Sequence, residues 1–161
     1  MFLRGIGILI VALSVSGCVD PVKPIHAWSA ETGRAASVST ITIINRSTNA
    51  TEESLAALKQ QLDQATAMCA RGPNKYELQV QVDNFKLGNA GAAILIGDQH
   101  EIAGEVKLIN PETKDVAAQY YVQENRGGGG LIGVAMLASG ATGISRDYAN
   151  TVCKKIFFWG R

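Results

Sequence analysis

Hydrophobic and polar residues alternate with a two-residue period in several segments of the chain. The clearest segment runs from Tyr76 to Asp83, where Leu78, Val80 and Val82 alternate with charged or amide side chains. Such alternation is typical of a β-strand with one buried and one wet face. A run of mostly β-branched residues, VSTITIIN, covers residues 38–45. Together with the alternating segments it predicts four strands, over residues 38–45, 76–83, about 101–108 and 116–122.

Two further segments repeat with helical spacing. Residues 55–69 place apolar side chains at intervals of three and four, and Gly72-Pro73 follows as a stop signal. Residues 145–158 have the pattern of a second amphipathic helix. The inner stripes hold Leu55, Leu58, Leu62, Ala65 and Cys69 in the first helix, and Tyr148, Ala149, Val152, Cys153 and Ile156 in the second.

The resulting order, β-α-β-β-β-α, predicts an α+β fold. We expect a two-layer sandwich in which two helices cover one face of a mainly antiparallel four-stranded sheet. Phe85 and Leu87 change the parity of their strand, which predicts a bulge near Asp83-Asn84. The turn-forming residues 110–115 predict a hairpin between the last two strands.

The first 18 residues, MFLRGIGILIVALSVSGC, have the composition of a secretion leader. Arg4 supplies a positive charge, and the apolar run that follows is too short to span a bilayer. The segment Val15-Ser16-Gly17-Cys18 resembles the lipobox of bacterial lipoproteins, which signal peptidase II cuts before the cysteine. An ordinary secretory signal is the alternative interpretation.

The resemblance to lipoproteins implies an address. Cys18 would be acylated, and the acyl chains would hold the protein on a membrane without a span. In this class an Asp directly after the cysteine is the usual signal for inner-membrane retention, whereas here Val19 follows Cys18 and Asp20 comes one place later. The resemblance therefore implies the outer membrane, with the domain facing the periplasm. The body also resembles small periplasmic α/β lipoproteins, many of them uncharacterised.

The predicted domain organisation has three parts. Residues 1–17 are the signal peptide, 18–37 the lipidated cysteine and a flexible tether, and 38–161 the periplasmic α+β domain. Pro21 and Pro24 and the lack of any period support the tether, which would let the domain stand off the membrane. Trp28 would either sit in the lipid headgroup layer or pack onto the domain.

Charge and composition narrow the function further. The chain of 161 residues has a formal net charge of +1 and no run of Lys or Arg, which argues against nucleic acid as a partner. Two His and three Cys leave little material for a metal site or a nucleophilic triad, so we predict no catalytic residues, no cofactor and no metal. The one His/carboxylate cluster, Asp98-Gln99-His100-Glu101, is predicted to be a solvated surface group.

Two cysteines remain if Cys18 is acylated. Cys69 and Cys153 both lie on the inner stripes of helices that should cover the same sheet face. An oxidising compartment favours a disulfide between them, and two separate buried thiols are the alternative.

The Gly-rich segment 127–143 is the candidate interaction surface. It has four consecutive glycines followed by the uncharged run LIGVAMLASGAT. This run would dock on a protein or dip into the membrane interface, and residues 90–96 would enlarge the patch. The alternative is a glycine loop that enters a buried helical turn. The residues proposed for the surface are Gly129, Gly130, Leu131, Gly133, Val134 and Met136. If the segment lies outside the core, Gly133→Leu is expected to leave the domain folded and to impair function.

These observations favour a non-enzymatic accessory or scaffold protein. It would belong to an envelope assembly or transport machine and have an envelope protein as partner. A carrier of a small ligand or lipid, with a pocket between sheet and helices, is the alternative. An exposed apolar patch would favour the scaffold, and an enclosed apolar cavity would favour the carrier.

Overall fold

The computed structural model describes residues 20–128 and 130–160. Its strands form one open mixed sheet in the order β1-β5-β4-β3-β2, with β2 and β3 parallel and the other neighbours antiparallel. The strands are β1 Val22–His26, β2 Ala36–Asn45, β3 Asn74–Lys86, β4 Asp98–Ile109 and β5 Val116–Gly128. The helices are α1 Ala30–Arg34, α2 Glu52–Cys69, α3 Ala90–Leu95, α4 Gly130–Leu137 and α5 Gly140–Lys155.

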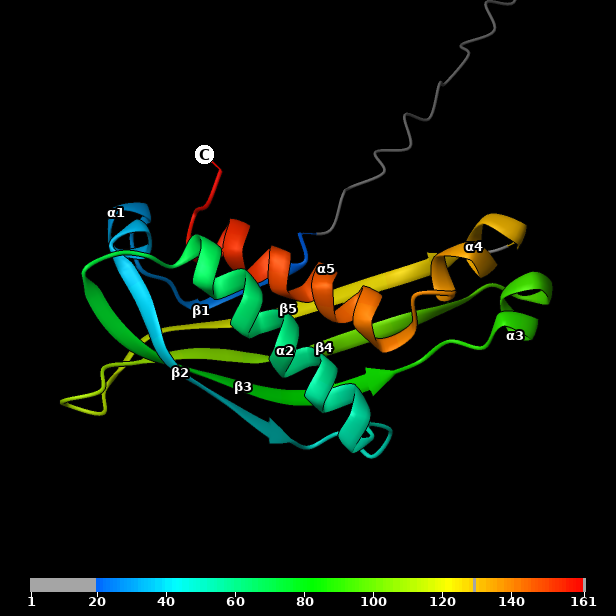
Figure 1. Ribbon diagram of the computed structural model, residues 1–161, viewed down its shortest axis with the longest axis horizontal. Helices are drawn as coiled ribbons and strands as arrows, with labels where there is room; N and C mark the ends of the chain where they lie inside the picture. Colours follow the sequence, from blue (N-terminus) through cyan, green and yellow to red (C-terminus); the bar gives the residue numbers. More distant parts are fainter. Residues whose placement is uncertain (1–19, 129, 161) are drawn as a thin grey trace, which may run out of the picture.

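Two layers make up the body of the molecule. Helices α2 and α5 lie side by side across one face of the sheet (Figure 1). Leu58 and Leu62 of α2 are fully buried, as are the alternate β3 residues Leu78, Val80 and Val82. Burial of this apolar face is the main favourable term in folding. The predicted two-layer α+β class is confirmed, but the described residues form five strands and five helices instead of four and two.

The predicted bulge and hairpin are both present. The β3–β4 register shifts between Val82 and Asn84, so Phe85 returns to the buried side and is fully buried. Strands β4 and β5 pair along their whole lengths on either side of the turn. At their other end they extend past the two long helices and lead to α3 and α4 (Figure 1).

Residues 20–37, predicted to belong to a flexible tether, instead form part of the domain. Strand β1 pairs with β5, with Val22 opposite Val122. Pro24 is compatible with this strand because β1 lies at the sheet edge. Proline has no N–H, and at an edge no neighbouring strand needs that hydrogen-bond donor. The Trp28 indole N–H donates to the carbonyl of Ile156 at 2.8 Å, and its ring packs edge-on against Phe157. Trp28 thus packs onto the domain.

Candidate functional site

An exposed aliphatic surface lies at one end of the molecule. Helices α3 and α4 lie side by side there, beyond the ends of α2 and α5 (Figure 1). Leu95 and Ile96 are each 84% exposed, Leu131 is 82% exposed and Ile132 78%. We call this surface the α3–α4 tip and define it by the exposed side chains of Ile94, Leu95, Ile96, Leu131, Ile132 and Met136.

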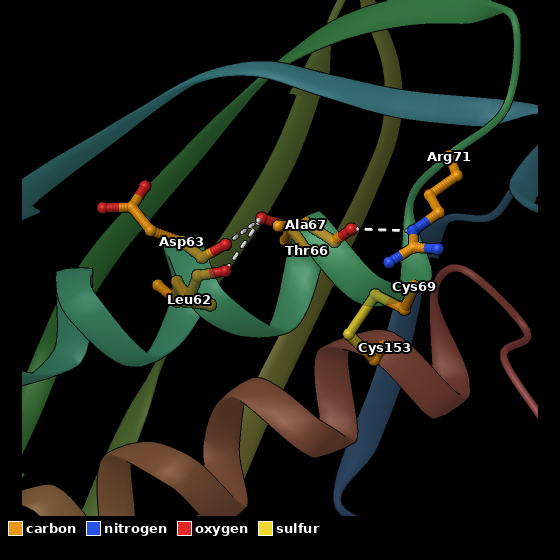
Figure 2. The surroundings of a disulfide bond; sticks show 7 residues. All are labelled: Leu62, Asp63, Thr66, Ala67, Cys69, Arg71 and Cys153. Atoms are coloured by element: carbon orange, nitrogen blue, oxygen red, sulfur yellow. Dashed lines mark hydrogen bonds between the residues drawn. A yellow bond between two sulfur atoms is a disulfide. The ribbon is translucent and has the colours of Figure 1, made fainter.

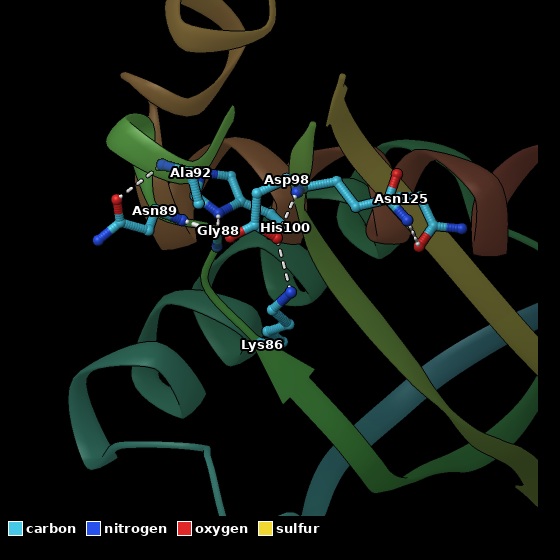
Figure 3. A network of polar contacts seen from close by, with 8 residues as sticks. Lys86, Gly88, Asn89, Ala92, Asp98, His100 and Asn125 are labelled. Carbon is cyan, nitrogen blue, oxygen red and sulfur yellow. Dashed lines mark hydrogen bonds and ion pairs between the residues drawn. The ribbon is translucent and has the colours of Figure 1, made fainter. Parts of the chain in front are cut away.

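Polar contacts at its N-terminus hold α3 in place. The Asn89 side chain caps the helix, because its Oδ1 accepts from the N–H groups of Gly91 at 2.8 Å and Ala92 at 3.2 Å. The backbone N–H of Asn89 in turn donates to the Asp98 carboxylate at 2.8 Å (Figure 3). The start of α3 is thereby fixed to the start of β4.

The Asp98 carboxylate collects three donors at this point. Besides Asn89, it accepts from Lys86 Nζ at 2.6 Å (Figure 3). It also accepts from the backbone N–H of Gln99 at 2.9 Å. The N–H of Asn89, the Lys86 ammonium and the N–H of Gln99 lower the pKa of Asp98 from 3.8 to about 2. The carboxylate is therefore ionised at neutral pH, and its charge is matched within the base of the tip.

His100 connects the two helices of the tip. Its side chain is nearly inaccessible, at 2% exposure. Nδ1 accepts from the N–H of Gly88 at 2.9 Å, so the network assigns the ring proton to Nε2, which donates to the carbonyl of Leu137 at 3.1 Å. The imidazole thus joins the segment before α3 to the last residue of α4. The prediction that this cluster is a solvated surface group is wrong for His100.

Arg126 of β5 fixes the other side of α4. Its Nε donates to the carbonyl of Met136 at 3.2 Å, and its Nη1 forms an ion pair with Asp147 of α5. Ser139 Oγ donates to the same carbonyl at 3.2 Å. A cation at the C-terminal end of a helix satisfies carbonyls that have no partner within the helix.

Gly133 is the packing contact between α4 and β5. A Cβ at this position would lie 2.1 Å from the carbonyl oxygen of Gly128. This separation is too short for two atoms that are not bonded, so the backbone of α4 or β5 would have to shift. The expectation that Gly133→Leu leaves the domain folded required the segment to lie outside the core, and the burial of Gly133 removes that condition at this position. The glycine permits the close approach of helix and strand.

The residues proposed for the interaction surface are divided by the structure. Gly130, Leu131 and Met136 are exposed, Val134 is half-buried and Gly133 is buried. Gly129 lies outside the described residues, as does Cys18. The sequence proposal left out Ile132, although it is 78% exposed and lies within the same uncharged run.

The disulfide predicted between Cys69 and Cys153 is present (Figure 2). It joins the last residue of α2 to α5, across a sequence separation of 84 residues and a Cα–Cα distance of 5.7 Å. Nearby, Arg71 Nε donates to the carbonyl of Ala67 at 2.8 Å and so satisfies a carbonyl at the end of α2 (Figure 2). The bridge holds the two long helices together at the end of the body away from the tip.

The space predicted for a ligand pocket, between sheet and helices, holds core side chains. Leu62, Val80, Val106 and Val152 are all fully buried within one cluster there. A hollow of about 500 Å³ lies elsewhere, along the β1–β5 edge. It is formed by Asp20, Pro21, Lys23, Tyr121, Gln123, Glu124 and Asn125.

The described part of the chain contains neither a candidate membrane span nor a candidate metal cluster. None of its helices has both the length and the apolar character needed to cross a membrane. Within residues 20–128 and 130–160, no three His, Cys, Asp or Glu side chains are grouped so that they could hold a metal ion.

Comparisons with known proteins give structural similarity only. No family model matches the sequence, and no curated protein matches it. The PelC dodecamer from Paraburkholderia phytofirmans is similar in structure, with a TM-score of 0.48 and 13% identity over 82% of this chain and 96% of that chain. A candidate lipoprotein from Caulobacter crescentus CB15 has a TM-score of 0.46 and 18% identity over 82% of this chain and 97% of that chain. These scores and identities are too low to assign a function.

Proposed function

We propose that this chain is a non-enzymatic lipoprotein of the outer membrane that works as an accessory or scaffold in an envelope assembly or transport machine. Its acyl chains would be attached to Cys18, and its domain would face the periplasm and contact an envelope protein. The observation that carries the proposal is the α3–α4 tip, an exposed apolar surface by which the domain would dock on another component of the envelope. Four aliphatic side chains there are more than three-quarters exposed, on a small domain whose other large apolar residues are mostly buried.

The construction of the tip supports a contact role. An aliphatic surface in water is unfavourable for solubility, so a chain that keeps one gains from covering it. Here the surface has a fixed shape, because Asp98, His100 and Arg126 hold the helices that carry it. A shaped, exposed apolar surface suits docking better than it suits the enclosure of a small ligand.

The disulfide supports an extracytoplasmic location. Disulfides persist in oxidising compartments such as the bacterial periplasm and are rare in the cytosol. The Cys69–Cys153 bridge and the leader that ends at Cys18 therefore favour the same side of the inner membrane.

The anchor is tested by cell fractionation in a bacterium with two membranes. Cys18→Ala removes the acceptor of the acyl chains, so we expect an uncut or soluble product in place of an outer-membrane protein. Ser14→Ala, which leaves Val15 to Cys18 unchanged, is the matched control and should fractionate as the wild type does. A Cys18→Ala protein that still fractionates as a mature outer-membrane species would contradict the anchor.

The scaffold role is tested by crosslinking in intact cells. Photoreactive residues at Met68 and Val116, which are exposed on the body, should form an adduct with one reproducible envelope protein. The adduct should disappear in the Cys18→Ala background, because the chain is then misplaced. A small molecule that copurifies with the chain, in the absence of any protein adduct, would instead support a carrier.

A further inference from the structure

The side chains of the α3–α4 tip have the composition of a lipid-facing surface. The helix sequences are AGAAIL and GLIGVAML, which contain no charged, aromatic or amide residue. Protein-binding surfaces are enriched in Tyr, Trp and Arg, which dominate their binding energy. An aliphatic surface with none of these residues resembles the hydrocarbon of a bilayer more closely than it resembles a protein interface.

The charges near the tip are already paired. Lys86 and Asp98 form an ion pair with a 2.6 Å separation, and Arg126 pairs with Asp147. The buried imidazole of His100 has partners at both nitrogens. The tip can therefore enter an apolar layer without bringing an unpaired charge into it, which would otherwise be the main cost.

The shape of the tip also suits a bilayer. Helices α3 and α4 form a projection at the free end of the β4–β5 pair (Figure 1). A convex projection needs a matching hollow in a protein partner, whereas lipid chains deform around it. Short apolar elements that lie in the interfacial layer bind membranes in this way.

The path of the chain brings the anchor to the same edge of the domain. Because β1 is antiparallel to β5, the chain traced backward from Val22 runs in the direction in which β5 approaches α4. The N–H of Gln123 donates to the carbonyl of Pro21 at 2.8 Å, so this end of β1 lies level with Gln123. From Gln123 to the end of β5 at Gly128 the strand rises about 17 Å.

The connection between the anchor and the domain is short. Cys18 precedes Asp20 by two residues, which span at most about 7 Å. The tether of 20 residues expected from the sequence would have let the domain stand off the membrane, but β1, α1 and the start of β2 take up most of its length. Acyl chains on Cys18 would therefore hold the β1–β5 edge against the bilayer, with the tip further along the same edge.

We infer that the α3–α4 tip inserts into the same bilayer leaflet as the acyl chains, so that the domain contacts the membrane at two points. The inference rests on the proposed function for the acylated Cys18 and names the partner of the tip as the lipid bilayer. Two contacts on one edge fix the orientation of the domain, which a single flexible anchor does not. The remaining surface, including the polar face of the sheet, is then presented to the periplasm.

The test places a polarity-sensitive fluorophore on the tip of the full, acylated protein. Once Cys18 is acylated and Cys69 is bridged to Cys153, Ile132→Cys provides the one free thiol for labelling. The protein is reconstituted into vesicles of phosphatidylethanolamine and phosphatidylglycerol. Val116→Cys, at the opposite end of β5, is the matched control.

We expect a several-fold rise and a blue shift of the emission from the probe at position 132, and quenching by lipids that carry a nitroxide in the acyl chain. The probe at position 116 should stay unchanged. If the protein floats with the vesicles while both probes remain in water, the lipid inference is overturned and the anchor stands. Shielding of position 132 only at high protein concentration, or only with a bound envelope protein, also overturns it, in favour of a second copy or a protein partner.

A second measurement separates the tip from the anchor. If mass spectrometry finds no acyl chain on Cys18, the proposed anchor fails. The tip is then tested without an anchor, by mixing the Cys18→Ser chain with the same vesicles. Binding that Leu131→Asp weakens about tenfold or more would support insertion of the tip, since a charge is costly in the bilayer. Circular dichroism checks that this exposed variant is folded, and no measurable binding by the Cys18→Ser chain would overturn the inference.

Discussion

The body and the α3–α4 tip are built in opposite ways. In the body, apolar side chains face inward between the sheet and helices α2 and α5, and the polar side chains face water. In the tip, the aliphatic side chains face outward, and polar groups such as His100 and Asp98 make the internal contacts. Burial stabilises the first region, whereas specific hydrogen bonds and ion pairs hold the second.

This difference separates stability from contact. A residue that stabilises the body contributes through the apolar area that it removes from water, and this contribution carries no charge that could titrate. The contacts of the tip depend on charge and on hydrogen-bond geometry, so they can be disrupted while the body stays folded. Changes in the two regions should therefore be separable by experiment.

The largest effect is expected in the body, from loss of the disulfide. The double change Cys69→Ser with Cys153→Ser should lower the free energy of unfolding by about 4 to 5 kcal/mol, because the bridge closes a long loop in the unfolded chain. Chemical denaturation of the oxidised protein and of the variant measures this difference. A variant as stable as the wild type would show that α2 and α5 hold together without the bridge.

A smaller and local effect is expected from His100→Phe. The N–H of Gly88 and the carbonyl of Leu137 lose their partner, at a cost of about 1 to 3 kcal/mol for each group that stays buried. Hydrogen exchange should accelerate at Gly88 and in α3 and α4, with much less change in α2. His100→Gln, which can still accept and donate, should recover part of the protection; equal exchange in all three proteins would contradict the bridging role.

Asp98 should make the tip sensitive to acid. Its pKa is lowered in the folded state from 3.8 to about 2, so its contribution is fully present above about pH 4 and is lost as the pH falls toward 2. Asp98→Asn should already show faster exchange in α3 at pH 7, with no further dependence on this group in acid. A wild-type tip whose protection is unchanged from pH 5 to pH 2 would rule out this role of the carboxylate.

The sequence was sufficient to predict most elements of the body and the apolar segments of the tip, but not strand β1 or the two helices of the tip. Long periodic segments, such as those around Leu62 and Val80, predicted their elements because several turns or alternations agree. Helices α3 and α4 have only six and eight residues, with apolar or small side chains on every side, so no period distinguishes a helix from a loop. Strand β1 was missed because Pro24 argues against a strand unless its place at the sheet edge is known.

The burial of His100 could not be read from its neighbours in the sequence. Asp98 and Glu101 beside it suggested a solvated position. The group that buries the imidazole, the end of α4 at Leu137, comes 37 residues later and is brought back by the β4–β5 hairpin. Local sequence shows the chemistry of a side chain, whereas its surroundings depend on the topology.

The smallest effect is expected from Tyr148→Phe, which compares a buried polar group of the body with His100 of the tip. Within the described residues, the fully buried hydroxyl of Tyr148 has no hydrogen-bond partner, unlike the imidazole of His100 in the tip. Burial raises the pKa of this hydroxyl, so it stays protonated and its removal changes no charge. Tyr148→Phe keeps the ring and deletes an unsatisfied group, so the free energy of unfolding should be unchanged or rise by up to about 1 kcal/mol. The matched control is Tyr120→Phe, because the Tyr120 hydroxyl accepts from the backbone N–H of Trp28 at 3.2 Å and its loss should cost about 0.5 to 1.5 kcal/mol. Thermal and chemical denaturation of both variants measures the contrast, and a loss of more than 1 kcal/mol in Tyr148→Phe would show that a buried water satisfies the hydroxyl.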